Sequence, residues 1–224
     1  MKILAMADLH GNLPDVEAYL DDTDVVLIAG DIAPDYSCWH KVNIDYQDIW
    51  LNTKFYEWAK KLGKPLYGCY GNHDYGTLNK KDLQVQIHAS AAVDKYLLFA
   101  WTSPSSGWNY TTRDLAWDHP ANTLKGSIES RLADIFANEE ENSRKTPEIW
   151  VCHGQPFGEN YPYGSQALYE AIIKYQPKAV FAGHVHHGER IREVGNTRIY
   201  NCSVTDNAYD LVREPVYIDV DWSD

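Results

Sequence analysis

The chain has 224 residues, of which 44% are hydrophobic and 23% are charged, and these values are ordinary for a globular protein. A chain of this length can bury one sizeable core, so we expect a single domain over residues 1–224. The net charge of −12 argues against binding of duplex nucleic acid, which requires clusters of Lys and Arg. It does not argue against a small phosphate ester as substrate, because bound divalent ions would reverse the local charge.

Targeting signals and paired cysteines are not evident. No apolar run approaches the roughly 18 residues of a membrane-spanning helix, and residues 1–7 are too short for a signal peptide. The four cysteines, which are Cys38, Cys69, Cys152 and Cys202, show no close-paired zinc spacing. We interpret them as free thiols in a reducing compartment, and therefore expect a cytoplasmic protein that does not associate with membranes.

Apolar runs alternate with helical patterns along the chain. Buried strands are predicted over residues 3–7, 24–29, 65–70, 96–101, 148–152 and 179–182, and three more short strands between residues 189 and 220. Leu51, Phe55, Trp58 and Leu62 are spaced by four, three and four residues, which predicts the clearest helix, ending at Gly63. Other helices are predicted over residues 14–20, 128–136 and 168–175, and residues 34–46 are interpreted as a surface loop. The alternation predicts an α/β fold with strands buried on both faces.

Five short polar motifs each follow a predicted strand. They are Asp8-Leu9-His10, Gly30-Asp31, Gly71-Asn72-His73-Asp74, His153-Gly154 and Gly183-His184-Val185-His186. In open α/β sheets, ligands gather beyond the carboxyl ends of the strands, so we expect these motifs to form one site. The candidate metal ligands are Asp8, His10, Asp31, Asn72, His153, His184 and His186.

These side chains offer nitrogen and oxygen ligands without a thiolate. Such a set favours Mn, Fe, Zn, Co or Ni over Ca and Cu(I). We expect two divalent ions, with Mn²⁺ preferred and Mg²⁺ within the acceptable range. Two ions about 3.5–4 Å apart can hold the attacking and leaving oxygens of an in-line displacement and lower the pKa of a bridging water.

His73 lies within a motif and is assigned as the catalytic proton donor, because the pKa of histidine lies near the working pH. Asp74 is the second candidate catalytic residue, as a partner that orients His73 or, alternatively, as a turn residue. The remaining histidines, which are His40, His88, His119 and His187, are interpreted as non-ligands. The aromatic segment with Trp101, Trp108, Tyr110 and Trp117 either stacks a nucleobase, packs in the core or forms a dimer contact.

The five motifs together resemble those of the calcineurin-like metallophosphoesterase superfamily, and no motif position departs from its pattern. The resemblance implies a four-layer αββα sandwich of two mixed β-sheets. It also implies that one metal is held by Asp8, His10, Asp31 and His186, and the other by Asp31, Asn72, His153 and His184. Asp31 would then bridge the two ions, with His73 as the proton donor.

A narrower resemblance is to the MPPED-type branch of small phosphodiesterases. The segments that carry it are residues 50–58, 102–108, 153–156, 164–168 and 201–203. It implies hydrolysis of small phosphodiesters, especially cyclic nucleotides, by a metal-bridging hydroxide. The substrate would be a small diester or nucleotide, and the oligomeric state stays open.

Three other functions remain as alternatives. The first is a phosphomonoesterase, including a protein Ser/Thr phosphatase. No paired arginines adjoin the motifs to bind a dianionic monoester, although Arg113 and Arg131 are candidates for that role. A nuclease is disfavoured by the acidic composition, and a non-catalytic scaffold is disfavoured because every ligand and His73 are present.

Overall fold

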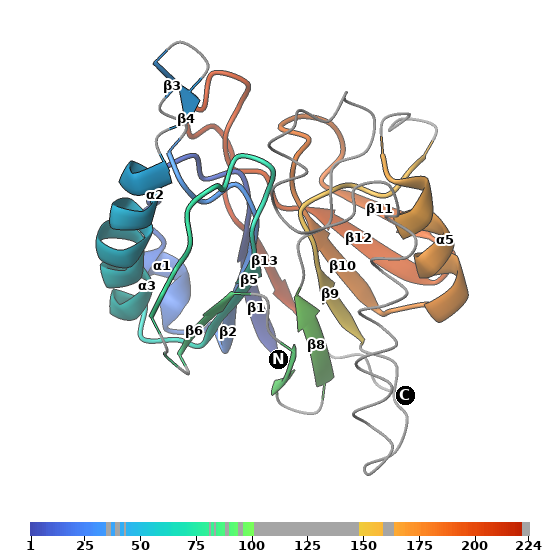
Figure 1. Cartoon of the computed structure of the whole chain (residues 1–224). Helices are drawn as coiled ribbons and strands as arrows, with labels where there is room; N and C mark the ends of the chain where they lie inside the picture. Colours follow the sequence, from blue (N-terminus) through green and yellow to red (C-terminus); the bar gives the residue numbers. More distant parts are fainter. Residues whose placement is uncertain are drawn as a thin grey trace.

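The computed structural model describes residues 1–34, 37–38, 41–42, 44–80, 82, 84–87, 90–93, 96–100, 148–158 and 164–220 (Figure 1). The predicted helix at 128–136, the aromatic segment, Arg113, Arg131, His40, His88 and His119 lie outside these residues. Within the described part of the chain, no helix is both long and apolar enough to cross a membrane.

The first sheet contains five strands. Its order is β13 (Val216–Asp219), β1 (Lys2–Met6), β2 (Val25–Ala29), β5 (Leu66–Cys69) and β6 (Val85–Ile87). The strands β1, β2, β5 and β6 run parallel, and β13 pairs antiparallel with β1. The sheet is therefore mixed, as the resemblance implied.

The second sheet contains six strands and is also mixed. Its order is β11 (Ile191–Val194), β12 (Thr197–Asn201), β10 (Ala179–Ala182), β9 (Ile149–Val151), β8 (Tyr96–Ala100) and β7 (Ser90–Val93). The inner strands are parallel, and the edge strands β11 and β7 are antiparallel to their neighbours. The predicted tail strands are confirmed as β11, β12 and β13, and the last of them joins the first sheet.

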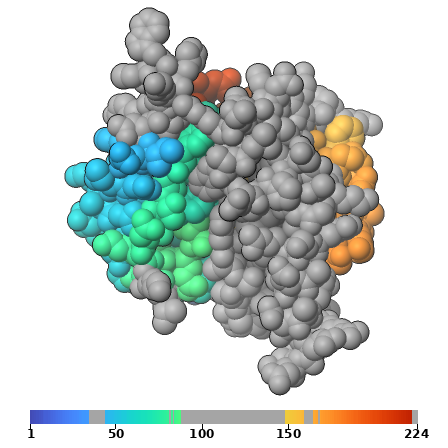
Figure 2. Space-filling model, in the orientation of Figure 1, coloured from blue at the N-terminus to red at the C-terminus, as the bar shows by residue number. Residues whose placement is uncertain are grey.

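Helices cover the outer faces of the two sheets. They are α1 (Glu17–Leu20), α2 (Ile44–Trp50), the π-helical turn η1 (Leu51–Phe55), α3 (Tyr56–Lys61) and α5 (Gln166–Tyr175). The first four lie on one side of the molecule and α5 lies on the other (Figure 1). Figure 2 shows the same division on the surface, where residues near 50 and residues near 170 occupy opposite flanks. A two-stranded hairpin, β3 (Ser37–Cys38) with β4 (Lys41–Val42), precedes α2.

Successive side chains of the central strands point to opposite faces of their sheet, so they pack in different layers of this αββα arrangement. Ile3 and Ala5 of β1 pack in the cluster between the sheets, together with Phe181 of β10. Leu4 and Met6 point to the other face, where they pack with residues of the helices. Because both faces of β1 and β2 are covered, these strands are continuous apolar runs, as the sequence indicated.

The helix that follows β4 begins earlier than we predicted. Residues 34–46 were expected to form a loop, but α2 starts at Ile44 and is followed directly by η1 and α3. The apolar pattern is misleading here, because Ile44 and Ile49 are exposed while the polar Gln47 is buried. The predicted end is confirmed, since α3 stops at Lys61.

Candidate metal centre

The five motifs meet where the strands of both sheets end. Two main-chain hydrogen bonds join the first two motifs, from the Asp8 nitrogen to the Gly30 oxygen and from the His10 nitrogen to the Asp31 oxygen, each 2.9 Å long. In the second sheet, the Gly183 nitrogen donates to the His153 oxygen over 2.9 Å. Parallel strand pairing thus brings motifs that are distant in the sequence to one edge.

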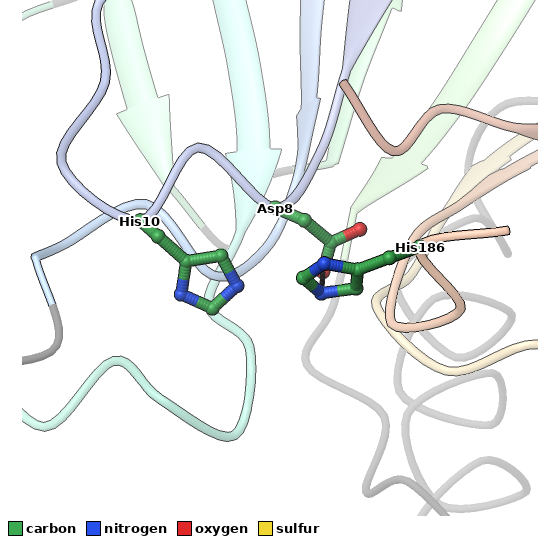
Figure 3. Close-up of side chains that lie close together, drawn as sticks. All are labelled: Asp8, His10 and His186. Carbon is green, nitrogen blue, oxygen red and sulfur yellow. Dashed lines mark ion pairs between the residues drawn. The ribbon is translucent and has the colours of Figure 1, made fainter. Parts of the chain in front are cut away.

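One cluster of candidate ligands consists of Asp8, His10 and His186 (Figure 3). Their ligand atoms lie within 4.8 Å of one another. The Nε2 atom of His186 is 3.5 Å from Oδ1 of Asp8, and the rings of His10 and His186 are 5.2 Å apart. Asp8 follows β1, whereas His186 follows β10, so each sheet contributes to this cluster.

The second cluster consists of Asp8, Asp31 and His153, and two other predicted ligands adjoin it. Oδ1 of Asn72 lies 2.9 Å from Nε2 of His153. The ring of His184 lies 5.2 Å from the ring of His153. The structure therefore brings all seven predicted ligands into one region.

Asp31 faces both clusters with a single oxygen. Its Oδ2 atom lies 3.2 Å from Nε2 of His153 and 3.8 Å from Nε2 of His10. Its other oxygen accepts a hydrogen bond from the His73 main-chain nitrogen over 2.8 Å. One oxygen of Asp31 therefore adjoins candidate ligands of both clusters.

The histidine tautomers fit metal binding. Nδ1 of His153 lies 2.9 Å from the carbonyl oxygen of Ala29, which can only accept a hydrogen bond, so this nitrogen carries the proton. Nε2 of this ring then faces the oxygens of Asn72 and Asp31, so it needs either a proton of its own or a metal ion between itself and these oxygens. Nδ1 of His186 likewise donates to the Asp206 carbonyl oxygen over 2.7 Å, which leaves its Nε2 for an ion.

His10 has buried ring nitrogens, and neither of them has a hydrogen-bond partner. Leaving such a group unpaired in the interior costs roughly 1–3 kcal/mol. One face of the ring stacks on Tyr209, with centroids 3.8 Å apart and planes inclined by 15°. A metal ion would satisfy one of the nitrogens, so this orphaned ring fits the proposed cofactor.

The electrostatics also favour a cation. Burial raises the pKa of Asp31, but the neighbouring histidines, His153 and His73 foremost, together outweigh it and hold this pKa well below its usual range. Burial lowers the pKa of His153, but the carboxylates of Asp31 and Asp8 and the carbonyl group of Ala29 together outweigh it and raise this pKa to about 10. Burial and the neighbouring His153 lower the pKa of His184 to about 4, so that ring is neutral and its lone pair is available at neutral pH. A divalent ion can replace the proton on His153 as the required positive charge.

Four candidate ligands have left-handed backbone conformations. The φ angles are 55° for Asp8, 46° for His10, 51° for Asp31 and 70° for His184. Such conformations are uncommon in residues other than glycine and cost roughly 1–3 kcal/mol each. Strain of this kind concentrates at functional sites, where the surrounding structure holds it in place.

Two motif glycines allow the close approach of these ligands. Gly30 has a φ of +85°, and a Cβ atom there would lie 2.5 Å from Nδ1 of His153. A Cβ atom at Gly71 would overlap the carboxylate of Asp31. Both positions therefore exclude larger residues for a steric reason, and Gly30 does so for a conformational reason as well.

His73 and Asp74 lie beside the ligands. The half-buried His73 ring meets the His10 ring edge-on at 5.3 Å. The buried Asp74 carboxylate accepts hydrogen bonds from the main-chain nitrogens of Ile32, Ala33 and Gly71. Burial and the charge of Asp31 raise the pKa of Asp74 to about 6. These contacts connect two motif loops, and a role for Asp74 in orienting His73 stays a prediction.

Several residues near the site were not singled out as site residues in the sequence. They are Gln47, Ser203, Thr205, Asp206 and Tyr209, and each contacts a ligand or the loop that carries one. The only signal was the inclusion of Ser203 in the resemblance over residues 201–203. His187, interpreted as a non-ligand, is exposed.

The family model for calcineurin-like phosphoesterases matches residues 1–188 of this chain. The chain belongs to the calcineurin-like phosphoesterase family. It is therefore assigned as a metal-dependent phosphoric ester hydrolase, with the two clusters as its candidate ligand groups. The match does not distinguish the narrower small-phosphodiesterase branch, which stays a prediction.

Solved structures agree on the fold of this family member. One crystal structure aligns with a TM-score of 0.63 and 17% identity, covering 89% of each chain. The crystal structure of TT1561 of Thermus thermophilus aligns with a TM-score of 0.57 and 13% identity, covering 89% of this chain and 88% of that one. No curated protein matched the sequence. At these identities the likeness concerns the fold alone.

Proposed function

We propose that this phosphoesterase is a dinuclear enzyme that hydrolyses small phosphodiesters, with cyclic nucleotides as the substrate class and Mn²⁺ as the preferred ion. The observation that carries the dinuclear assignment is the position of Asp31 Oδ2, which faces His10 on one side and His153 on the other. Asp8 is also shared between the two candidate groups. Shared carboxylates at this spacing suit a pair of ions better than one.

The residues of the site divide the chemical tasks. When bound, the ions would neutralise phosphate charge and acidify a water molecule. Asp8 and Asp31 supply negative charge, and the neutral His10 and His184 supply lone pairs. His73 stands beside His10, where it would donate a proton to the leaving oxygen.

A diester is favoured over a monoester because the described residues offer little additional positive charge. Among them, no Lys or Arg forms an ion pair with Asp8 or Asp31. Arg190 donates to the carbonyl oxygens of Asn201 and Ser203, and Arg213 donates to that of Gly188. A diester has one negative charge fewer than a monoester dianion and needs less compensation from such side chains. The net charge of −12 also disfavours a duplex nucleic acid as substrate.

Metal-free protein reloaded with Mn²⁺ tests the proposal. Initial rates are measured with bis-p-nitrophenyl phosphate and p-nitrophenyl phosphate, followed by 2′,3′- and 3′,5′-cyclic nucleotides. We expect diester turnover well above monoester turnover, and its loss on chelation. A preference for the monoester would overturn the diesterase assignment and favour a phosphomonoesterase, including a protein Ser/Thr phosphatase.

The neighbouring histidines His186 and His187 provide a matched control. His186→Ala removes a candidate ligand and is expected to lower turnover at least about 100-fold. His187→Ala changes an exposed side chain and is expected to leave turnover within about twofold of the wild type. Equal loss in both variants would show that the loop is sensitive in general and would argue against a specific role for His186.

A further inference from the structure

Residues 203–209, called here the 203–209 segment, lie beyond the part of the chain that matches the family model. The segment continues from β12 and joins the end of β1. The Ala7 nitrogen donates to the Cys202 oxygen over 2.9 Å, and the Val204 nitrogen donates to the Ala7 oxygen over 3.1 Å. Arg190 fixes the start of the segment by donating to the carbonyl oxygens of Asn201 and Ser203.

Asp8 is held by two hydroxyl groups of this segment. The buried Ser203 hydroxyl donates to Oδ2 of Asp8. The buried Thr205 hydroxyl donates to the main-chain oxygen of Asp8 over 2.7 Å. Together they fix the carboxylate and its strained backbone, with Oδ1 facing His186.

His186 is oriented by the next residue of the segment. Its Nδ1 donates to the Asp206 carbonyl oxygen over 2.7 Å. The same carbonyl oxygen accepts a hydrogen bond from the Tyr209 nitrogen over 2.9 Å. The Asp206 carboxylate closes the turn by accepting from the Ala208 and Asp210 nitrogens over 2.8 and 3.0 Å.

The third member of the cluster, His10, also contacts the segment, because its ring stacks on the ring of Tyr209. Tyr209 has a φ of 66°, and the side chain of Asn12 donates to its carbonyl oxygen over 2.9 Å. The ring is therefore held against His10 by a strained and hydrogen-bonded backbone. Every member of the cluster of Asp8, His10 and His186 thus has a partner in the 203–209 segment.

His153, which belongs to the other cluster alone, is held from elsewhere, because its Nδ1 bonds to the carbonyl oxygen of Ala29. Asp31, which faces both clusters, accepts from the nitrogen of His73. We propose that the 203–209 segment positions Asp8, His10 and His186, and so sets the affinity of one of the two ions much more than that of the other, although Asp8 is shared between the two clusters. Ser203, Thr205 and Tyr209 are positioning residues in this proposal, which rests on the dinuclear site proposed above.

Titration of metal-free protein with Mn²⁺ tests the proposal through binding rather than turnover. Calorimetry gives the two stepwise dissociation constants, and electron paramagnetic resonance distinguishes single Mn²⁺ ions from coupled pairs. We expect Ser203→Ala and Tyr209→Ala to weaken one step by roughly 10–100-fold, with the other within about threefold. At one equivalent of Mn²⁺ both variants should give the single-ion spectrum, and the coupled signal should require excess Mn²⁺.

Matched variants separate positioning from a general loss of packing. Ser165→Ala removes another buried serine hydroxyl, the N-cap of α5, and should leave both binding steps unchanged. Tyr209→Phe keeps the stacked ring and should bind as the wild type does. If Ser203→Ala does not fold, Thr205→Val replaces it, with Thr197→Val as the control, because both hydroxyls are buried and donate to a carbonyl oxygen.

The outcomes separate this proposal from the one on which it rests. A wild-type protein that binds two ions, with variants that bind both unchanged or weaken both equally, would overturn the role of the segment alone. A wild-type protein that binds fewer than two ions would overturn the dinuclear site and the segment's role with it. Selective loss of one ion in the variants would establish the role of the segment.

Discussion

The side-chain amide of Gln47 donates a hydrogen bond to the main-chain oxygen of His73 over 2.9 Å. The same amide donates to the oxygen of Pro34, and its carbonyl oxygen accepts from the nitrogens of Tyr75 and Gly76. One buried side chain of α2 therefore satisfies four main-chain groups around the loop that carries the proposed proton donor.

Replacing Gln47 with Met should loosen that loop. The substitution keeps the length of the side chain but leaves buried main-chain groups unpaired, so we expect a loss of about 2–4 kcal/mol in the free energy of unfolding. Turnover should fall about tenfold with the Mn²⁺ content unchanged. Denaturant titration and metal analysis measure the two effects. Gln166→Met, on the exposed side of α5, is the control, and equal effects in the two variants would contradict the assignment.

His73→Asn should affect turnover according to the leaving group. Donation of a proton matters most when the leaving alkoxide is basic, so a diester with an alkyl leaving group should lose at least about 100-fold in turnover. A p-nitrophenyl diester should lose much less, because its leaving group is stable without a proton. Steady-state rates on the two substrates, with the metal content verified, make the comparison. A uniform loss on both would exclude His73 as the proton donor.

Gly71→Ala should disrupt the metal centre, because the added Cβ would overlap the Asp31 carboxylate. Gly63→Ala is a matched control at a position with a φ of +66° and no heavy atom within 4 Å of the added Cβ. We expect both variants to lose about 1–3 kcal/mol of stability, from crowding in the first and from backbone strain in the second. Only Gly71→Ala should lose Mn²⁺ affinity. Retention of both ions in that variant would show that the carboxylate can move away without cost.

Titration of Asp82, which lies outside the five motifs, should make the free energy of unfolding depend on pH. Hydrogen bonds from the Tyr56 hydroxyl, the Gln84 nitrogen and Lys60 lower the pKa of Asp82 from its ordinary value of 3.8 to about 2. Because the folded-state pKa is depressed, the stabilisation is fully present above about pH 5 and is lost as the pH falls towards 2.

The comparison of wild type with Asp82→Asn measures this effect. The difference in free energy of unfolding should be constant above pH 5 and should shrink between pH 4 and 2. A carboxyl carbon titration by NMR gives the pKa directly. A titration midpoint near the ordinary value would contradict the depressed pKa.

The sequence predicted best those elements whose apolar pattern coincides with burial. The run from Ala179 to Ala182 lies between Pro177 and Gly183, and β10 has these bounds. The start of α2 was missed because its exposed side carries Ile44 and Ile49 while Gln47 is buried. The apolar pattern of the sequence and the burial of the side chains disagree there, and the burial is known only from the structure.

The candidate site, like the fold, could be predicted only where its residues stand in a local sequence pattern. Candidate ligands such as Asp31 and His184 follow strands beside glycines, so their position could be predicted from strand ends alone. Ser203 and Tyr209 do not stand in such a pattern, and they reach Asp8 and His10 only because the end of β12 lies beside the end of β1. The register between two sheets cannot be predicted from the local sequence.

The contact of Ser203 with Asp8 joins residues 195 positions apart, and the contact of His184 with Asp8 joins residues 176 apart. Contacts between such distant residues form slowly, because a long stretch of chain must be ordered before they can be made. During synthesis, the first aspartate of the site emerges early but must wait for nearly the whole chain before its partners exist. Assembly of the metal centre is thus expected among the last steps of folding, and a nascent or truncated chain has no complete site with which to capture ions.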